Sequence, residues 1–280
     1  MDERLQRRVQ RYGWDLAAAD YEPLWSTQLA GVQATLMSQA ALRPRERVID
    51  VACGTGLISF AAARAVGASG QVVGVDLSGE MVAAAALRAR ERRLPNVEFA
   101  RMDAEHLECA NAGFDAALCA LGLMYLPEPE RALLEMRRVL RPGGRMVSAV
   151  WGERAHCGWA GLFGIMQAEV ASDVCPLFFR LGQAGTLARA CVDAGFEAVR
   201  TECITTTLDY ASADEACEAA FVGGPVALAW SRFDAEVRER VRQRYIESIA
   251  PWRDGEAYRV PGEFVVVSAR VPGVPPEQPR

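Results

Sequence analysis

The sequence predicts an α/β protein built on a doubly wound, mostly parallel β-sheet. Between residues 46 and 151, short apolar runs alternate regularly with longer stretches of helical periodicity. These runs contain few polar residues, as expected for strands that helices cover on both faces. A glycine turn, Gly54-Thr55-Gly56, lies directly between one such run and the next helical stretch. The 280 residues, 51% of them hydrophobic, are sufficient for one large domain of this class.

The elements can be justified in order along the chain. Residues 4–41 are predicted to be helical because apolar and aromatic side chains recur every three or four positions, and Pro44 closes this region. Strands are then expected at residues 46–51, 71–76, 97–101, 114–120 and 145–151. Helices are expected at residues 57–66, 79–93 and 128–140, with Ser78 as an N-cap and Gly67 as a stop.

The alternation ends after residue 151. Helices are expected at residues 158–172 and 184–195, and a helical stretch interrupted at residues 223–225 is expected over residues 212–250. Strands are expected at residues 197–208 and 263–270. The proline-rich residues 272–280 are expected to form a disordered tail.

Composition argues against several classes of function. A net charge of −5 and a pI near 5.3 disfavour a nucleic-acid partner, which would require a basic face. The 8 cysteines form no CxxC pair, so neither a metal site nor a redox motif is predicted. A charged N-terminus and the absence of an apolar run of about 20 residues predict no leader and no membrane span. We therefore expect a cytoplasmic protein with free thiols.

Two acidic residues lie where a nucleotide would bind. Asp50 and Asp76 are at or near the carboxyl ends of two strands predicted to be neighbours, where one acid can bind a ribose diol. A dinucleotide fingerprint would have a third glycine at the position of Ser59. A carboxylate at Asp50 would also repel a pyrophosphate but would suit a cationic ligand. A nicotinamide-dependent oxidoreductase is the weaker alternative on these grounds.

Five motifs in order extend this interpretation. They are Val48 to Gly56, Asp76-Leu77-Ser78 with Met81, Met102 to Glu105, Phe114-Asp115, and Leu140 to Gly144. Over residues 20–151 the sequence resembles the class I S-adenosylmethionine-dependent methyltransferases, and is most similar to the group containing the ubiquinone and menaquinone biosynthesis C-methyltransferases. The resemblance implies a Rossmann-like, seven-stranded sheet whose last strand is antiparallel. It also implies a helical cap from the N-terminus and the C-terminal insertions.

The resemblance implies S-adenosylmethionine as cofactor. It assigns Asp50 to the methionine amino group, Asp76 to the ribose hydroxyls and Asp103 to the adenine amine. Ala52 stands where the family often has glycine. The complete implied cofactor set is Asp50, Ala52, Gly54, Thr55, Gly56, Asp76, Leu77, Met81, Asp103, Ala104, Ala120 and Leu121.

The domain organisation follows from the same resemblance. Residues 1–271 are expected to form a single methyltransferase domain. Within it, residues 1–43 form a helical lid, 44–151 the cofactor-binding core, 152–262 cap insertions with the sixth strand, and 263–270 the last strand.

The methyl acceptor is expected to be a small apolar molecule, aromatic or polyketide-like, methylated on oxygen or carbon. Aromatic residues near the predicted cleft would suit such a molecule. The substrate or lid candidates are Tyr21, Trp25, Trp151 and Trp159. His156, just after the fifth core strand, is the candidate catalytic base. A non-catalytic protein that binds S-adenosylmethionine is a further alternative.

Overall fold

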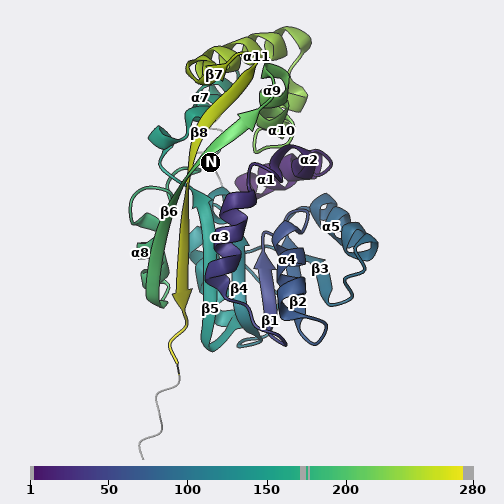
Figure 1. Ribbon diagram of the computed structural model, residues 1–280, viewed down its shortest axis with the longest axis vertical. Coiled ribbons are helices and arrows are strands. Elements are labelled where there is room, and N and C mark those ends of the chain that lie inside the picture. The colour runs from purple at the N-terminus through teal and green to yellow at the C-terminus, as the bar shows by residue number, and fades with distance from the viewer. Residues whose placement is uncertain (1–2, 171–174, 176, 274–280) are drawn as a thin grey trace, which may run out of the picture.

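A mixed sheet organises the protein (Figure 1). The computed structural model describes residues 3–170, 175 and 177–273. The strands follow the order β3-β2-β1-β4-β5-β8-β6, parallel from β3 to β5, with β8 antiparallel to both β5 and β6. The expected sheet with its antiparallel last strand is confirmed. Its strands are β1 (Arg47–Val51), β2 (Gln71–Asp76), β3 (Val97–Arg101), β4 (Phe114–Ala120), β5 (Leu140–Trp151), β6 (Glu197–Tyr210) and β8 (Ala257–Arg270).

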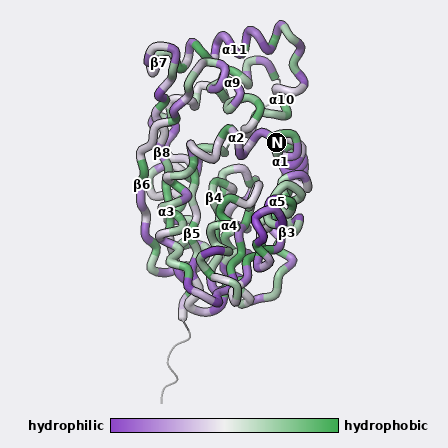
Figure 2. Tube along the Cα trace, turned by 45° about the vertical axis from the view of Figure 1, so that its right-hand side comes forward, coloured by the Kyte–Doolittle hydropathy of each residue, from purple (hydrophilic) through white to green (hydrophobic). Residues whose placement is uncertain are grey.

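Helices cover both faces of the central strands. In β4 the consecutive residues from Ala116 to Cys119 are all buried, and neighbouring strand residues point to opposite faces. Figure 2 shows these central strands as mostly hydrophobic and α11 as mostly hydrophilic. The core helices are α3 (Ala30–Ala40), α4 (Leu57–Val66), α5 (Gly79–Glu91), α6 (Pro129–Val139) and α8 (Thr186–Asp193).

Further helices gather beyond the carboxyl ends of the parallel strands, at the top of Figure 1. Two come from the N-terminus, and the others from the region between β5 and β8. Segments far apart in the sequence therefore form one cap over one edge of the sheet. The cap helices are α1 (Glu3–Ala17), α2 (Tyr21–Trp25), α7 (Gly161–Gln167), α9 (Ala213–Phe221), α10 (Ala227–Arg232) and α11 (Ala235–Ile249).

Local signals in the sequence explain several boundaries. The Ser78 hydroxyl accepts from the Met81 N–H at 3.1 Å, which confirms it as the N-cap of α5. Gly67, with φ of 69°, ends α4. The expected interruption at residues 223–225 separates α9 from α10, and a second break precedes Asp234, whose side chain caps α11.

Other boundaries differ from expectation. The N-terminal stretch is three helices rather than one. β8 begins at Ala257 rather than at residue 263, because it forms a hairpin with a short extra strand, β7 (Arg253–Asp254), and pairs with β6 along most of its length. The helix expected at residues 158–172 ends at Gln167; residues 171 and 172 lie outside the described residues, as do residues 274–280 of the expected tail. Among the described residues no helix is sufficiently long and apolar to cross a bilayer.

Candidate cofactor and substrate pocket

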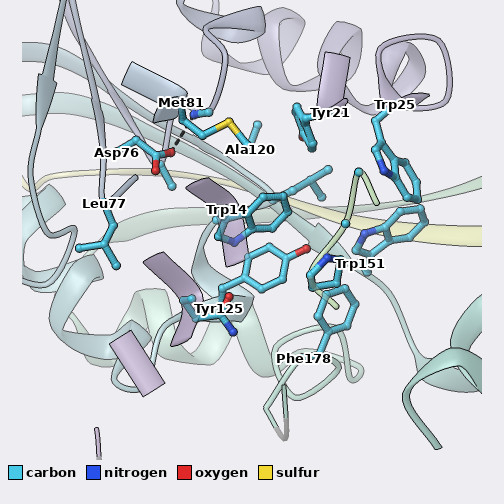
Figure 3. Close-up of a pocket in the computed structure, with 18 of the residues that line it drawn as sticks. Trp14, Tyr21, Trp25, Asp76, Leu77, Met81, Ala120, Tyr125, Trp151 and Phe178 are labelled. Atoms are coloured by element: carbon cyan, nitrogen blue, oxygen red, sulfur yellow. Dashed lines mark hydrogen bonds between the residues drawn. The ribbon is translucent and has the colours of Figure 1, made fainter. Parts of the chain in front are cut away.

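A pocket lies between the carboxyl edge of the sheet and the cap (Figure 3). Thirteen of the residues proposed from sequence line it: Tyr21, Trp25, Ala52, Gly54, Asp76, Leu77, Met81, Asp103, Ala104, Ala120, Leu121, Trp151 and Trp159. The remaining four, Asp50, Thr55, Gly56 and His156, are not among its lining residues.

The Asp76 carboxylate is fixed by the backbone at the end of β2. The Gly54 N–H donates to its Oδ2 at 2.8 Å, and the Ser78 N–H donates to its Oδ1 at 2.9 Å. Burial raises the pKa of Asp76, and these hydrogen bonds partly oppose the increase. Each carboxylate oxygen has a second lone-pair direction, so the side chain can still accept two hydroxyl protons.

Asp50 is buried within β1 and does not line the pocket. It is 1% exposed, and its Oδ2 accepts from the Ser59 hydroxyl at 2.5 Å. Its Oδ1 is buried with no hydrogen-bond partner among the described residues. Burial raises the pKa of Asp50 to about 7, and the nearby charge of Asp76 adds to the increase. This site favours a cationic neighbour, which would stabilise the ionised carboxylate.

The loops after β1 and β4 bend sharply at the pocket. Ala52 and Leu121 are in the left-handed region, with φ of 56° and 62°. This conformation suits glycine better than alanine, which accounts for the family's preference for glycine at the position of Ala52. A Cβ on Gly122 would lie 2.4 Å from the Ala52 Cβ, so the bare backbone at Gly122 makes room for the alanine.

The lid helix α1 is attached to the edge of the pocket by an ion-pair cluster. The Arg7 guanidinium pairs with Glu105 and lies 3.4 Å from Asp103 and 3.6 Å from Glu128. The Glu105 side chain is 2% exposed, so this carboxylate depends on Arg7 and on the Glu128 N–H for compensation. At the other end of the helix, Asp15 accepts from the Ser78 hydroxyl at 2.6 Å.

The second lid helix, α2, is attached through Glu22. This carboxylate lies 3.0 Å from Arg88 and 3.1 Å from Arg92 of the neighbouring α5 region. The Thr55 hydroxyl donates to it at 3.4 Å, so Thr55 connects the glycine turn to the lid and does not face the pocket. The basic run at residues 88–93 therefore contributes two arginines to the lid contact.

Aromatic side chains form a continuous belt around the pocket, and every member lines it. Neighbouring ring centroids are 4.8 to 6.3 Å apart. Tyr21 and Trp25, one turn apart on α2, are its two ends, so the belt nearly closes (Figure 3). In order, the belt is Tyr21, Trp14, Tyr125, Phe178, Trp159, Trp151 and Trp25.

His156 is not one of the residues that line the pocket. Its imidazole is largely exposed and pairs with Glu263 at 2.9 Å, a hydrogen bond that raises its pKa. Tyr12, which the sequence placed in the lid segment, is 46% exposed and is not a lining residue. Neither His156 nor His106 lines the pocket.

Sequence reasoning missed several lining residues. Gln10 and Arg7 come from α1, and Tyr125, Tyr210 and Tyr245 come from three separate elements. Only the helical period of α1 carried a signal, because Arg7, Gln10 and Trp14 share one face at spacings of three and four. The three tyrosines are brought together by tertiary packing alone.

Comparisons with known proteins agree with this geometry. Residues 48–144 match the family described as a methyltransferase domain. The ubiquinone/menaquinone biosynthesis C-methyltransferase UbiE of Ralstonia pickettii is 40% identical over 123 residues, which are 41% of this chain and 49% of that protein. The 2-phytyl-1,4-naphtoquinone methyltransferase of Synechococcus elongatus is 38% identical over 107 residues, which are 38% of this chain and 46% of that protein. The chain spans about half the length of the curated relatives that it matches.

Solved structures cover more of the chain. The phosphoethanolamine N-methyltransferase 2 of Haemonchus contortus, in complex with S-adenosylhomocysteine, superposes with a TM-score of 0.60 at 17% identity, over 92% of this chain and 57% of that chain. The [4+2]-cyclase SpnF superposes with a TM-score of 0.61 at 26% identity, over 91% of this chain and 85% of that chain.

The match defines a methyltransferase domain over this part of the chain, and the similar solved structures share its fold. Residues 48–144 belong to the methyltransferase-domain family. They contain most of β1, all of β2 to β4 and α4 to α6, and residues 140–144 of β5. This part of the chain positions Asp50 and Asp76.

Proposed function

We propose that this chain transfers a methyl group from S-adenosylmethionine to an oxygen or carbon of a small, apolar, planar molecule. The observation that carries the proposal is the Asp76 carboxylate, held by two backbone N–H groups beside the glycine turn of a methyltransferase domain. When bound, the cofactor supplies a methyl group already activated on a sulfonium.

The residues present fit this cofactor. Asp76 retains lone pairs for the ribose hydroxyls, and Asp103 lies at the pocket edge where the resemblance implies the adenine amine. The unpartnered Oδ1 of Asp50 would be compensated by a positively charged group nearby. Leu77 and Met81 supply apolar walls. Two carboxylates and few basic groups suit an adenosyl sulfonium better than a pyrophosphate.

The acceptor half of the pocket is the aromatic belt. Its rings offer faces and edges to a planar ligand and keep water from the reacting groups. The indole N–H groups of Trp25 and Trp159 are buried without a hydrogen-bond partner among the described residues. A carbonyl, hydroxyl or ether oxygen on the ligand would satisfy such a donor, which favours an oxygenated ring. The named relatives methylate quinone-type molecules, which have this chemistry.

Positioning is proposed as the main contribution of the chain to the reaction. Aligning the acceptor with the methyl group supplies much of the rate of a displacement of this kind. Since neither histidine lines the pocket, we assign no base to His156. The pocket hydroxyls belong to tyrosines, and burial raises the pKa of Tyr21 and of Tyr125 well above the ordinary value. These hydroxyls therefore act as neutral hydrogen-bonding groups at neutral pH.

A second candidate is catalysis without methyl transfer. One observation favours it: the chain is similar in fold to the [4+2]-cyclase SpnF over most of the length of both chains. Such a protein would need the cleft to hold and shape its substrate but would release no S-adenosylhomocysteine. The nicotinamide alternative has less support, because the domain match and the named relatives are methyltransferases.

The test is a methyl-transfer screen with radiolabelled S-adenosylmethionine against quinols, phenols and aromatic polyketides. We expect labelled product together with one equivalent of S-adenosylhomocysteine. A matched variant, Trp159→Phe, keeps an aromatic ring but removes the indole N–H, and should weaken turnover of oxygenated acceptors. Cofactor binding without labelled product across the screen would favour the second candidate.

A further inference from the structure

Helix α1 presents apolar side chains outward. Leu5, Tyr12 and Leu16 are 39%, 46% and 50% exposed, and they share one face because they are seven and four residues apart. They are three of the six large hydrophobic residues that are exposed in the described part of the chain. Half of the exposed apolar side chains therefore lie in a single stripe on one 15-residue helix.

The buried face of the same helix is unusually polar. Its buried residues include Gln6 and Gln10, with Gly13 and Ala17. This face is offset from the apolar stripe by one residue, about 100° around the helix. Packing against the protein therefore does not account for Leu5, Tyr12 and Leu16, which point away from the buried face.

The charge of α1 also differs from that of the whole chain. The helix has four arginines and two carboxylates, whereas the chain has a net charge of −5. Arg8 is exposed and makes no ion pair with any residue that the structure describes. Arg11 stacks over the Tyr12 ring at 4.4 Å. The outward part of the helix thus combines an apolar stripe with a basic border.

We propose that α1 docks on an anionic phospholipid surface. Leu5, Tyr12 and Leu16 would enter the interfacial region, and Arg8 and Arg11 would lie against lipid phosphates. A second copy of the chain fits less well, because a symmetric contact would bring the arginines of both copies together. Charge therefore favours the lipid surface.

The position of α1 gives this docking a consequence. Arg7, Gln10 and Trp14 line the pocket from the same helix whose apolar stripe would contact lipid. An apolar acceptor dissolved in the bilayer would reach the pocket across a single helix. This last step rests on the proposed function, whereas the docking itself does not.

The experiment is flotation of the full chain with vesicles of phosphatidylcholine alone or mixed with phosphatidylglycerol. We expect binding to the mixed vesicles, weakening as salt is added, and little binding to neutral vesicles. Replacing Leu5, Tyr12 and Leu16 together by glutamine should reduce binding by about tenfold or more. The matched control replaces the other three exposed residues, Leu87, Leu134 and Val192, by glutamine and should bind as the parent does.

Two further measurements keep the outcomes distinct. Both triple variants should melt at the same temperature as the parent when followed by circular dichroism, which shows that they are folded. Arg8→Gln with Arg11→Gln should remove the preference for anionic vesicles while leaving the apolar stripe in place. The docking is refuted by equal flotation of the two triple variants, by equal binding to both vesicle types, or by no binding to either. It is also refuted if sedimentation velocity shows a dimer that the first triple variant abolishes while vesicles remain unbound.

Discussion

Asp76 is oriented before any ligand arrives. Its two carboxylate oxygens accept from the Gly54 and Ser78 N–H groups, so the side chain does not have to lose rotamer freedom when a ligand binds. The same contacts hold the glycine turn against the end of β2. We therefore propose that one residue contributes both to the shape of the loop and to recognition of the ligand.

Replacing Asp76 tests that assignment. Asp76→Asn keeps the shape of the side chain but removes its negative charge. Its amide N–H₂ would also face either the Gly54 or the Ser78 N–H, and two donors cannot form a hydrogen bond. We expect the affinity for S-adenosylhomocysteine, measured by calorimetry, to fall by about 1–3 kcal/mol. Asp209→Asn, an exposed carboxylate on β6, serves as the control. Unchanged affinity in a folded Asp76→Asn protein would refute the ribose assignment.

Asp50 should make cofactor binding depend on pH. Its raised folded-state pKa, about 7 against 3.8, means that the folded protein holds this proton more tightly than the unfolded chain. The free energy of unfolding that Asp50 contributes therefore decreases as the pH rises from 3.8 to about 7, and it stays constant above that pH. A cationic ligand prefers the ionised carboxylate, so S-adenosylmethionine should bind several-fold more tightly at about pH 8 than at about pH 6. Asp50→Asn should flatten this dependence in calorimetric titrations, and an unaltered pH profile would contradict it.

At the scale of single residues, the sequence predicts pocket residues that lie at strand ends, but it misses those that only tertiary packing brings to the pocket. Asp76 could be predicted because the ends of parallel strands meet at the same edge of the sheet, whereas Leu77 and Ala120 were implied by the family resemblance. Tyr210 and Tyr245 could not, because nothing local marks the end of β6 or the middle of α11 as part of a pocket. His156 illustrates the converse, since closeness in sequence to a strand end did not bring its side chain to the pocket.

Among the elements, the lid is held by ion pairs in addition to its aromatic contacts. Arg7 joins α1 to the Asp103–Glu105 loop, and Glu22 joins α2 to α5. Interactions of this kind weaken with salt and can open locally without unfolding of the sheet. We therefore expect ligands to enter the pocket past the lid helices.

Removing the Arg7 contact should loosen the lid. Arg7→Gln leaves the buried Glu105 carboxylate without its cation, so we expect faster amide exchange in α1 and several-fold weaker S-adenosylhomocysteine binding. Arg8→Gln, on the exposed side of the same helix, is the matched control and should change neither measurement. Equal exchange in the two variants would show that the Arg7 pair does not hold the helix.

The loops after β1 and β4 depend on each other. Because a Cβ on Gly122 would meet the Ala52 Cβ, Gly122→Ala should lower the free energy of unfolding by about 1–3 kcal/mol. Adding Ala52→Gly should recover part of that loss, since it removes the colliding methyl group. Gly164→Ala in α7, where a Cβ meets nothing within 4 Å, should be neutral or stabilising. Thermal denaturation measures all three, and additive losses in the double variant would contradict the compensation.

Element types were largely readable from the sequence, whereas some boundaries were not. The core strands and helices follow from apolar periodicity and from stop signals such as Gly67 and Ser78. The early start of β8 at Ala257 depends on pairing with the distant β6, with Pro261 inside the strand. No local pattern reports a partner strand about 50 residues away, so the hairpin with β7 was missed.

At the scale of the whole molecule, we propose that residues 1–271 are one domain. The pairing of β8 with both β5 and β6 joins the cap insertions to the sheet, and α1 and α2 close over the same pocket from the opposite end of the sequence. One side of this pocket is formed by the matched methyltransferase domain, where we propose that the cofactor binds, and the other walls are formed by the cap. Specificity for the acceptor would then reside in the cap.

The most direct test of the central claim is calorimetric titration of the full chain with S-adenosylhomocysteine and, in parallel, with NADH. The account predicts one binding site per chain for the thioether and none for the dinucleotide. Binding of NADH without binding of S-adenosylhomocysteine, or binding of neither, would contradict it.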